Sequence, residues 1–110
     1  MINYFLDVLS KYGIGAVRDG YESVPKEHCF AVWSIKHRKK MGADGYGIYW
    51  LVTYEVRIYY RDEKTDEDCR LEKNIENEIR ELDNLESDYD YDSKDKMDIT
   101  IYSFTASEEF

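Results

Sequence analysis

The chain has 110 residues and a formal net charge of −9, with 15% aromatic and 35% charged residues. This length suits one domain with a single core, and the supply of core-forming side chains excludes disorder over most of the chain. The acidic balance excludes a general nucleic-acid binder, which needs a contiguous cationic face. There is no long apolar run and no basic leader, so we expect neither a membrane span nor a secretory signal.

The first quarter of the chain predicts one helix and one short extended segment. Apolar side chains recur at three- and four-residue spacing over residues 2–12, and Gly13 follows where a left-handed residue commonly ends a helix. Residues 14–22 contain Gly15, Gly20 and an apolar pair, which favours a short strand or an extended connector. Pro25 imposes extended geometry on Val24 and marks a boundary.

Two strands are predicted in the middle of the chain. Residues 29–37 form the first, and its beginning has apolar side chains on both faces. The basic run 36–40 and the glycine-rich residues 41–47 then predict a flexible loop. Residues 48–60 alternate apolar and polar side chains, as a half-buried strand does. Because this strand is unusually long, we expect a bend or bulge in it, or a protruding hairpin end near residues 46–50.

The last third predicts a second helix and a final strand. Thr65 and Asp68 have the spacing of a capping box, which starts the helix. The side chains expected to face the core from this helix are Leu71, Ile75, Ile79 and Leu82, with Cys69 beside them. Those expected to face outward are Glu72, Lys73 and Glu76. Residues 83–96 are predicted to form a flexible acidic loop, residues 97–104 a strand, and residues 105–110 a loose tail.

These elements predict an α+β fold. We expect a single two-layer domain with an antiparallel or mixed sheet of four to five strands and two helices packed on it. Cys29 and Cys69 lie far apart in sequence, so two buried or half-buried thiols are favoured over a disulfide or a metal site.

No motif in the chain predicts catalysis. Residues 88–92 place Asp at alternate positions, as a calcium loop does, but Ser93 and Ile99 occupy the positions where an EF-hand has Gly and Glu, so a solvated acidic loop is favoured over a cation site. His28 and His37 have no further ligands at useful spacing, and simple strand-end histidines are favoured. We therefore predict a protein that is not an enzyme and that uses no cofactor or metal.

Charge is divided unevenly along the chain. Residues 62–95 hold fifteen acids and five bases, whereas residues 1–61 hold six acids and nine bases. Such asymmetry favours contact between one half of a molecule and the other half of its neighbour. The basic run alone has three interpretations: a solvated loop, a contact with a subunit or structural partner, or a nucleic-acid contact. The candidate interface residues are Lys36, Arg38, Lys39, Lys40, Tyr46, Tyr49, Asp88, Asp90 and Asp92.

The order of these segments resembles the tail terminator, or tail-completion, proteins of long-tailed bacteriophages and their prophage relatives. The segments that carry the resemblance are Val24-Pro25, Phe30-Ala31-Val32-Trp33, Gly42-Ala43-Asp44, Tyr54-Glu55-Val56-Arg57-Ile58-Tyr59-Tyr60, the charged helix 66–79, and Lys96-Met97-Asp98-Ile99-Thr100-Ile101-Tyr102. Each is a strand or helix pattern, so the order and spacing carry the specificity. The acidic residues 83–95 and the basic run depart from the family pattern, and head-closure and other neck proteins share its size and style.

The resemblance implies a virion protein, made in the bacterial host cytoplasm, that acts by assembly. Its copies are expected to form a ring, a hexamer in the assembled tail, on the end of the tail tube. The ring halts tube growth and binds the head connector, so the implied partners are other copies of itself, the tail-tube protein and the head connector protein, with no membrane and no specific nucleic acid. The alternative is a small acidic inhibitor or immunity-type protein whose acids cover one continuous face and bind a basic partner.

Overall fold

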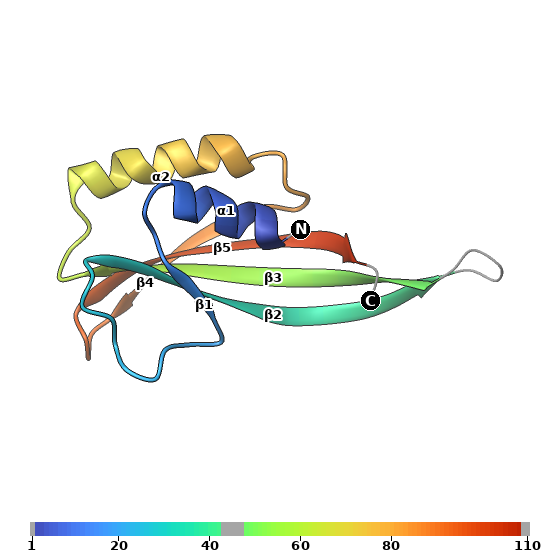
Figure 1. The fold of residues 1–110 in the computed structure, drawn as a ribbon, viewed down its shortest axis with the longest axis horizontal. Coiled ribbons are helices and arrows are strands. Elements are labelled where there is room, and N and C mark those ends of the chain that lie inside the picture. Colours follow the sequence, from blue (N-terminus) through green and yellow to red (C-terminus); the bar gives the residue numbers. More distant parts are fainter. Residues whose placement is uncertain (1, 43–47, 109–110) are drawn as a thin grey trace.

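The computed structural model describes residues 2–42 and 48–108. In chain order, the elements are α1 (Ile2–Lys11), β1 (Ala16–Arg18), β2 (Cys29–Gly42), β3 (Ile48–Arg61), α2 (Asp66–Ile79), β4 (Glu86–Asp92) and β5 (Met97–Glu108). Both helices lie on one face of a single sheet, and β2 and β3 extend together past the end of β5 (Figure 1). The molecule measures 53 × 29 × 21 Å. The predicted α+β domain of two layers is confirmed.

The sheet has the strand order β1-β2-β3-β5-β4. β1 runs parallel to β2, and all other neighbours are antiparallel. The register between β2 and β3 shifts between Ile35 and His37, so the irregularity expected in the long strand is a bulge in its partner strand. We call the distal part of this hairpin, residues 36–42 and 48–53, the arm.

The core lies between the sheet and the two helices. From β3 it takes the alternating set that the sequence pattern predicts, namely Val52, Tyr54, Val56, Ile58 and Tyr60. Phe104 of β5 stacks on Phe5 of α1, with ring centroids 5.7 Å apart, and on Tyr54, at 5.3 Å. Burial of these rings provides the hydrophobic stabilisation that holds α1 on the sheet.

α1 ends and α2 begins as their sequences predict, but α2 ends at Ile79, so the predicted place of Leu82 on this helix is wrong. Gly13 follows α1 with φ 77°, a left-handed conformation that glycine adopts without a steric penalty. At the start of α2, the Asp68 N–H donates to the Thr65 hydroxyl at 3.1 Å, and the Thr65 N–H donates to the Asp68 carboxylate at 2.9 Å. The expected capping box is therefore confirmed, as is the burial of Ile75 and Ile79 on its core side.

The strand predicted for residues 29–37 is confirmed, but the flexible loop expected after it is wrong for residues 38–42. β2 continues to Gly42 because β3 pairs with it throughout, for example Lys39 with Leu51 and Met41 with Tyr49. A long alternating partner strand supplies ladder hydrogen bonds that outweigh the low strand propensity of consecutive lysines. The remainder of the predicted loop, residues 43–47, lies outside the described residues.

The predicted acidic loop over residues 83–96 is also wrong in its central part. Residues 86–92 form β4, which pairs with β5 from Glu86 opposite Ser103 to Asp92 opposite Met97. The backbone ladder decides this structure, although aspartate is depleted in strands. The C-terminal tail is likewise a strand as far as Glu108, because β3 pairs with β5 from Arg61 to Trp50. Residues 109–110 lie outside the described residues.

Candidate functional site

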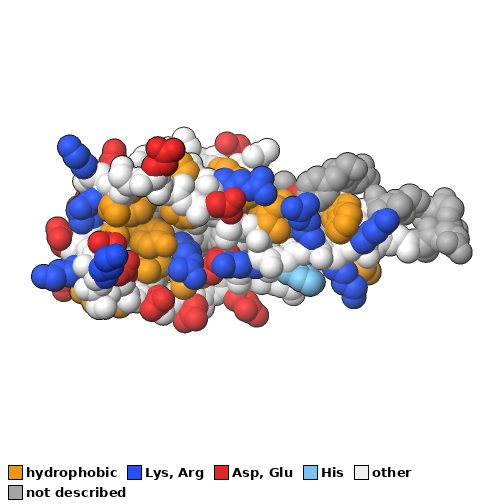
Figure 2. Space-filling model, turned by 90° about the horizontal axis from the view of Figure 1, so that it is seen from below, with side chains coloured by type: hydrophobic (Ala, Val, Ile, Leu, Met, Phe, Trp, Pro, Cys, Tyr) orange, Lys and Arg blue, Asp and Glu red, His pale blue; other side chains and the backbone are white. Residues whose placement is uncertain are grey.

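The face of the sheet away from the helices is covered by no second layer among the described residues. Figure 2 views this side and shows hydrophobic side chains gathered at the end away from the arm. Lysine and arginine side chains are spread along the length of this face, including the arm. At the hydrophobic end, the rings of Phe30 and Tyr59 stack at 5.1 Å, and Tyr21 meets the Phe30 ring edge-on at 5.4 Å. Tyr21 comes from the β1–β2 connection, so that segment covers part of the apolar end.

A shallow hollow of about 620 Å³ lies near the middle of this open face. Its charged lining includes Lys36, Glu55, Arg57 and Asp88. The Glu55 carboxylate pairs with the Lys36 ammonium at 2.8 Å and with the Arg57 guanidinium at 3.4 Å. Because both cations of the hollow pair with Glu55, they indicate a solvated sheet face better than an acid–base site.

The basic candidate residues lie on the arm, within β2. Lys36, Arg38, Lys39 and Lys40 are all exposed. After the bulge, His37 and Lys39 stand opposite Thr53 and Leu51, which face the open side of the sheet. Arg38 and Lys40 stand opposite Val52 and Trp50 and so face the helix side. The arm therefore carries positive charge on both faces.

Of the two tyrosines predicted to join the basic run in an interface, the structure describes Tyr49 but not Tyr46. Tyr49 lies on β3 within the arm, opposite Met41, and its side chain is 38% exposed. Tyr46 lies outside the described residues. Tyr49 thus shares a surface with the basic run, as an interface tyrosine would.

The acidic candidate residues form the opposite edge of the sheet. Asp88, Asp90 and Asp92 alternate along β4 and stand opposite Ile101, Ile99 and Met97, which face the open side. Between them, the side chains of Tyr89 and Tyr91 face the helix side and are 63% and 53% exposed. The structure brings Asp88 and Lys36 to the same hollow, whereas Lys39, Lys40 and Tyr49 lie farther out along the arm.

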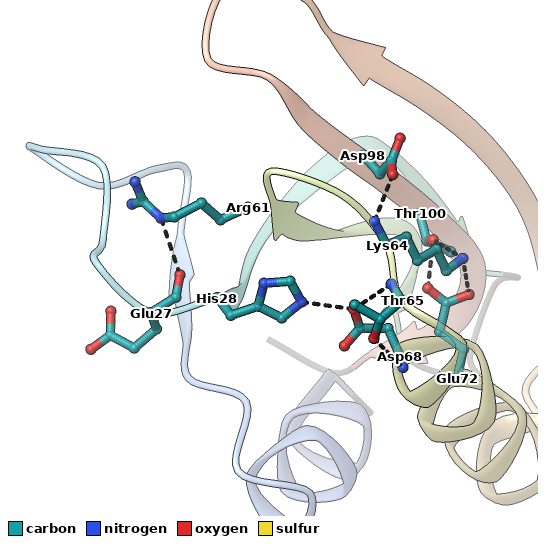
Figure 3. Close-up of polar contacts among 9 residues, drawn as sticks. All are labelled: Glu27, His28, Arg61, Lys64, Thr65, Asp68, Glu72, Asp98 and Thr100. Atoms are coloured by element: carbon teal, nitrogen blue, oxygen red, sulfur yellow. Dashed lines mark hydrogen bonds and ion pairs between the residues drawn. The ribbon is translucent and has the colours of Figure 1, made fainter.

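A buried polar cluster that the sequence analysis missed lies between α2 and β5 (Figure 3). The Lys64 ammonium donates to the Glu72 carboxylate at 2.6 Å and to the Thr100 hydroxyl at 3.0 Å, and that hydroxyl donates to Glu72 at 2.6 Å. Glu72 is 4% exposed, so its predicted outward orientation is wrong. The signal was present in the spacing, because residues 68, 72, 75 and 79 share one side of a helix. Lys64 supplies the charge that makes burial of Glu72 tolerable.

A second polar contact joins the β1–β2 connection to the start of α2 (Figure 3). The His28 ring nitrogen Nε2 lies 2.7 Å from the Asp68 carboxylate, which also accepts the Thr65 N–H. Burial raises the pKa of Asp68, but the hydrogen bonds from His28 and Thr65 outweigh it and hold that pKa below its ordinary value of 3.8. Asp68 therefore caps the helix and anchors His28 at once.

Replacing Asp68 with Asn should reduce the dependence of stability on acid pH. A carboxyl with a lowered pKa in the folded state stabilises the protein above its ordinary pKa, and that stabilisation is lost as the pH falls through the lowered value. We expect Asp68→Asn to cost about 1 kcal/mol near neutral pH and less below about pH 3. Thermal unfolding across this range measures it. Asp66→Asn, on the same helical turn and exposed, is the control, and identical pH profiles for the two variants would contradict the prediction.

Among residues 2–42 and 48–108, no group of three His, Cys, Asp or Glu side chains is placed to hold a metal ion. Both cysteines are free thiols; Cys29 is half-buried as expected, but Cys69 is exposed, so its predicted burial is wrong. Burial raises the pKa of Cys29 to about 12. No helix in the described part of the chain is long and apolar enough to cross a membrane.

The sequence matches no protein-family model, and a search of curated proteins found no match.

Proposed function

We propose that this protein is a structural subunit of a phage or prophage tail. Its copies form a ring, a hexamer in the assembled tail, that caps the tail tube and joins the tail to the head connector. The resemblance in element order supplies the role, and an α+β domain with two helices on its sheet is the fold that the resemblance implies.

One observation carries the proposal: opposite charges occupy opposite edges of the sheet. The strand order places the acidic strand β4 at one edge and β2, with its basic arm, near the other. A closed ring of identical subunits needs a heterologous interface, in which two different surfaces of one subunit complement each other. An acidic surface and a basic surface on separate edges meet that requirement. Two acidic surfaces, or two basic ones, repel each other, so only the complementary contact is favoured.

The distribution of the acids supports the ring over an acidic inhibitor. An inhibitor that covers a basic site needs carboxylates on one continuous face. The acids of β4 point to the open side of the sheet, whereas the helix α2, with Asp66 and Glu67 exposed, lies over the other side. The sheet therefore separates the two acidic groups.

The test is deletion of the gene from the phage or prophage genome that encodes the protein. We expect tails of irregular length and heads without tails in electron micrographs, with normal virions restored by the wild-type protein. Restoration should fail with Lys39→Glu/Lys40→Glu, because the basic arm then repels β4. Lys26→Glu, an exposed lysine in the β1–β2 connection, is the matched control. Normal, fully joined virions from the deletion strain would overturn the proposal.

A further inference from the structure

We propose that β4 of one subunit pairs, antiparallel, with the outer edge of β2 of a second copy, over residues 34–42. The sheet would then continue across the subunit boundary. This inference deepens the proposed function, because it assumes self-association and identifies the surfaces that make it.

Both edges are open to pairing. β1 covers the outer edge of β2 only from Ala31 to Trp33, and beyond that point no strand of the described residues pairs with that edge. β4 forms the other edge and has only β5 as a neighbour. An open edge presents alternate N–H and C=O groups that another strand can bind.

The outward N–H groups of β4 can be identified. The backbone N–H groups of Tyr89 and Tyr91 donate to the carboxylates of Asp88 and Asp90, each at 2.8 Å, and therefore do not point at β5. In the isolated subunit these carboxylates shield the edge, which limits indiscriminate pairing. Cations on an approaching strand would draw the carboxylates away and expose the N–H groups. The edge is thus prepared for a basic partner strand.

The strand directions predict the orientation of the pair. β2 and β5 both run antiparallel to β3, and β4 runs antiparallel to β5, so β4 runs opposite to β2. Copies related by rotation about an axis to which the strands are tilted keep these directions between neighbours, and β4 then meets the neighbour's β2 in the antiparallel sense.

The side chains then match on both faces. With the helix layers of the two copies on one side, the acids of β4 that face the open side (Glu86, Asp88, Asp90 and Asp92) lie beside the open-face cations of the arm. Those cations include Lys36 and Lys39. On the helix side, the exposed ring of Tyr91 meets Lys40, where an ammonium over an aromatic face is favourable, whereas the Tyr89 ring already has the Lys64 ammonium of its own subunit 4.9 Å from its centroid.

The register requires the two copies to be offset along the strands. Within one subunit, Glu86 is level with Ser103, Glu55 and Ser34 across the sheet. The rest of β4 lies level with residues of β2 that precede Ser34, away from the arm. To pair with residues 34–42, β4 of one copy must therefore shift along the strands toward the arm of the other copy. Closing a sheet into a barrel requires such a stagger, because tilted strands return to their starting register only if each step is offset.

Disulfide cross-linking of the full chain tests the contact. Lys39→Cys and Asp90→Cys would be placed in separate copies of different mass, both with Cys69→Ser to remove the exposed native thiol. Cys29 is half-buried, with its pKa raised to about 12, and should react slowly. We expect several-fold more heterodimer from the mixture than disulfide dimer from either variant alone. Replacing Lys39→Cys with Lys26→Cys is the matched control, and equal yields from the two mixtures would overturn the pairing.

A proline substitution tests the backbone hydrogen bonds. Tyr91→Pro removes an outward N–H and leaves the ladder to β5 intact, and Tyr91→Ala removes the same ring but keeps the N–H. We expect the proline variant to self-associate about three- to tenfold more weakly than the alanine variant in sedimentation experiments. Equal association, or a wild-type chain that is monomeric at all concentrations reached, would overturn the inference. These measurements use purified protein, so a negative result would overturn the strand pairing alone. Normal virions from the gene-deletion strain would instead overturn the proposed function.

Discussion

Glu72→Ala is expected to lower the free energy of unfolding by about 3–5 kcal/mol. The Lys64 side chain is 17% exposed, and its ammonium would lose its carboxylate partner at 2.6 Å while remaining in a largely buried position. The Thr100 hydroxyl, fully buried, would lose its acceptor at the same time. An uncompensated buried charge costs more than the pair contributes, so the loss should exceed that of an ordinary surface substitution. Denaturant unfolding measures the difference.

Two further variants make this result specific. Glu67→Ala removes an exposed carboxylate from the first turn of the same helix and should change stability by less than about 1 kcal/mol. Lys64→Met/Glu72→Leu replaces both charges with apolar groups and should recover much of the loss. If Glu72→Ala unfolds at the same denaturant concentration as Glu67→Ala, the buried pair has no structural role.

Phe104→Ala should also lower the free energy of unfolding by about 3–5 kcal/mol, because it leaves a cavity where two aromatic contacts meet. The Phe104 ring is 1% exposed and stacks on Phe5 of α1 and Tyr54 of β3. These contacts join α1 to the sheet, so the variant should also loosen that helix. Denaturant unfolding gives the stability, and amide hydrogen exchange over residues 2–11 gives the local effect.

A volume series separates packing from other causes. Phe104→Leu keeps most of the buried volume and should cost about 1–2 kcal/mol. Tyr91→Ala removes a ring that is 53% exposed and should cost less than about 1 kcal/mol. A Phe104→Ala variant no less stable than Tyr91→Ala would show that the stacked rings do not hold the helix on the sheet.

Local patterns predicted the framework of the fold because their signals act over short distances in the chain. The alternation in residues 48–60 placed the buried side chains of β3 correctly, since side chains of a strand alternate by geometry. The capping box at Thr65 and the left-handed Gly13 were likewise readable, because each depends on a few consecutive residues. Charge alone indicates the candidate basic and acidic residues, and which of them form an interface stays a prediction.

Local sequence patterns specify the two helices, the buried face of β3 and the uneven charge along the chain. Contacts between distant segments make the basic run and the acidic segment into strands and bury Glu72. The reason is that a strand draws its hydrogen bonds from residues far away in sequence, as β4 does from β5, and a buried charge depends on a partner from another segment, as Glu72 depends on Lys64. Pairing across the sheet also placed the two charged surfaces on opposite edges.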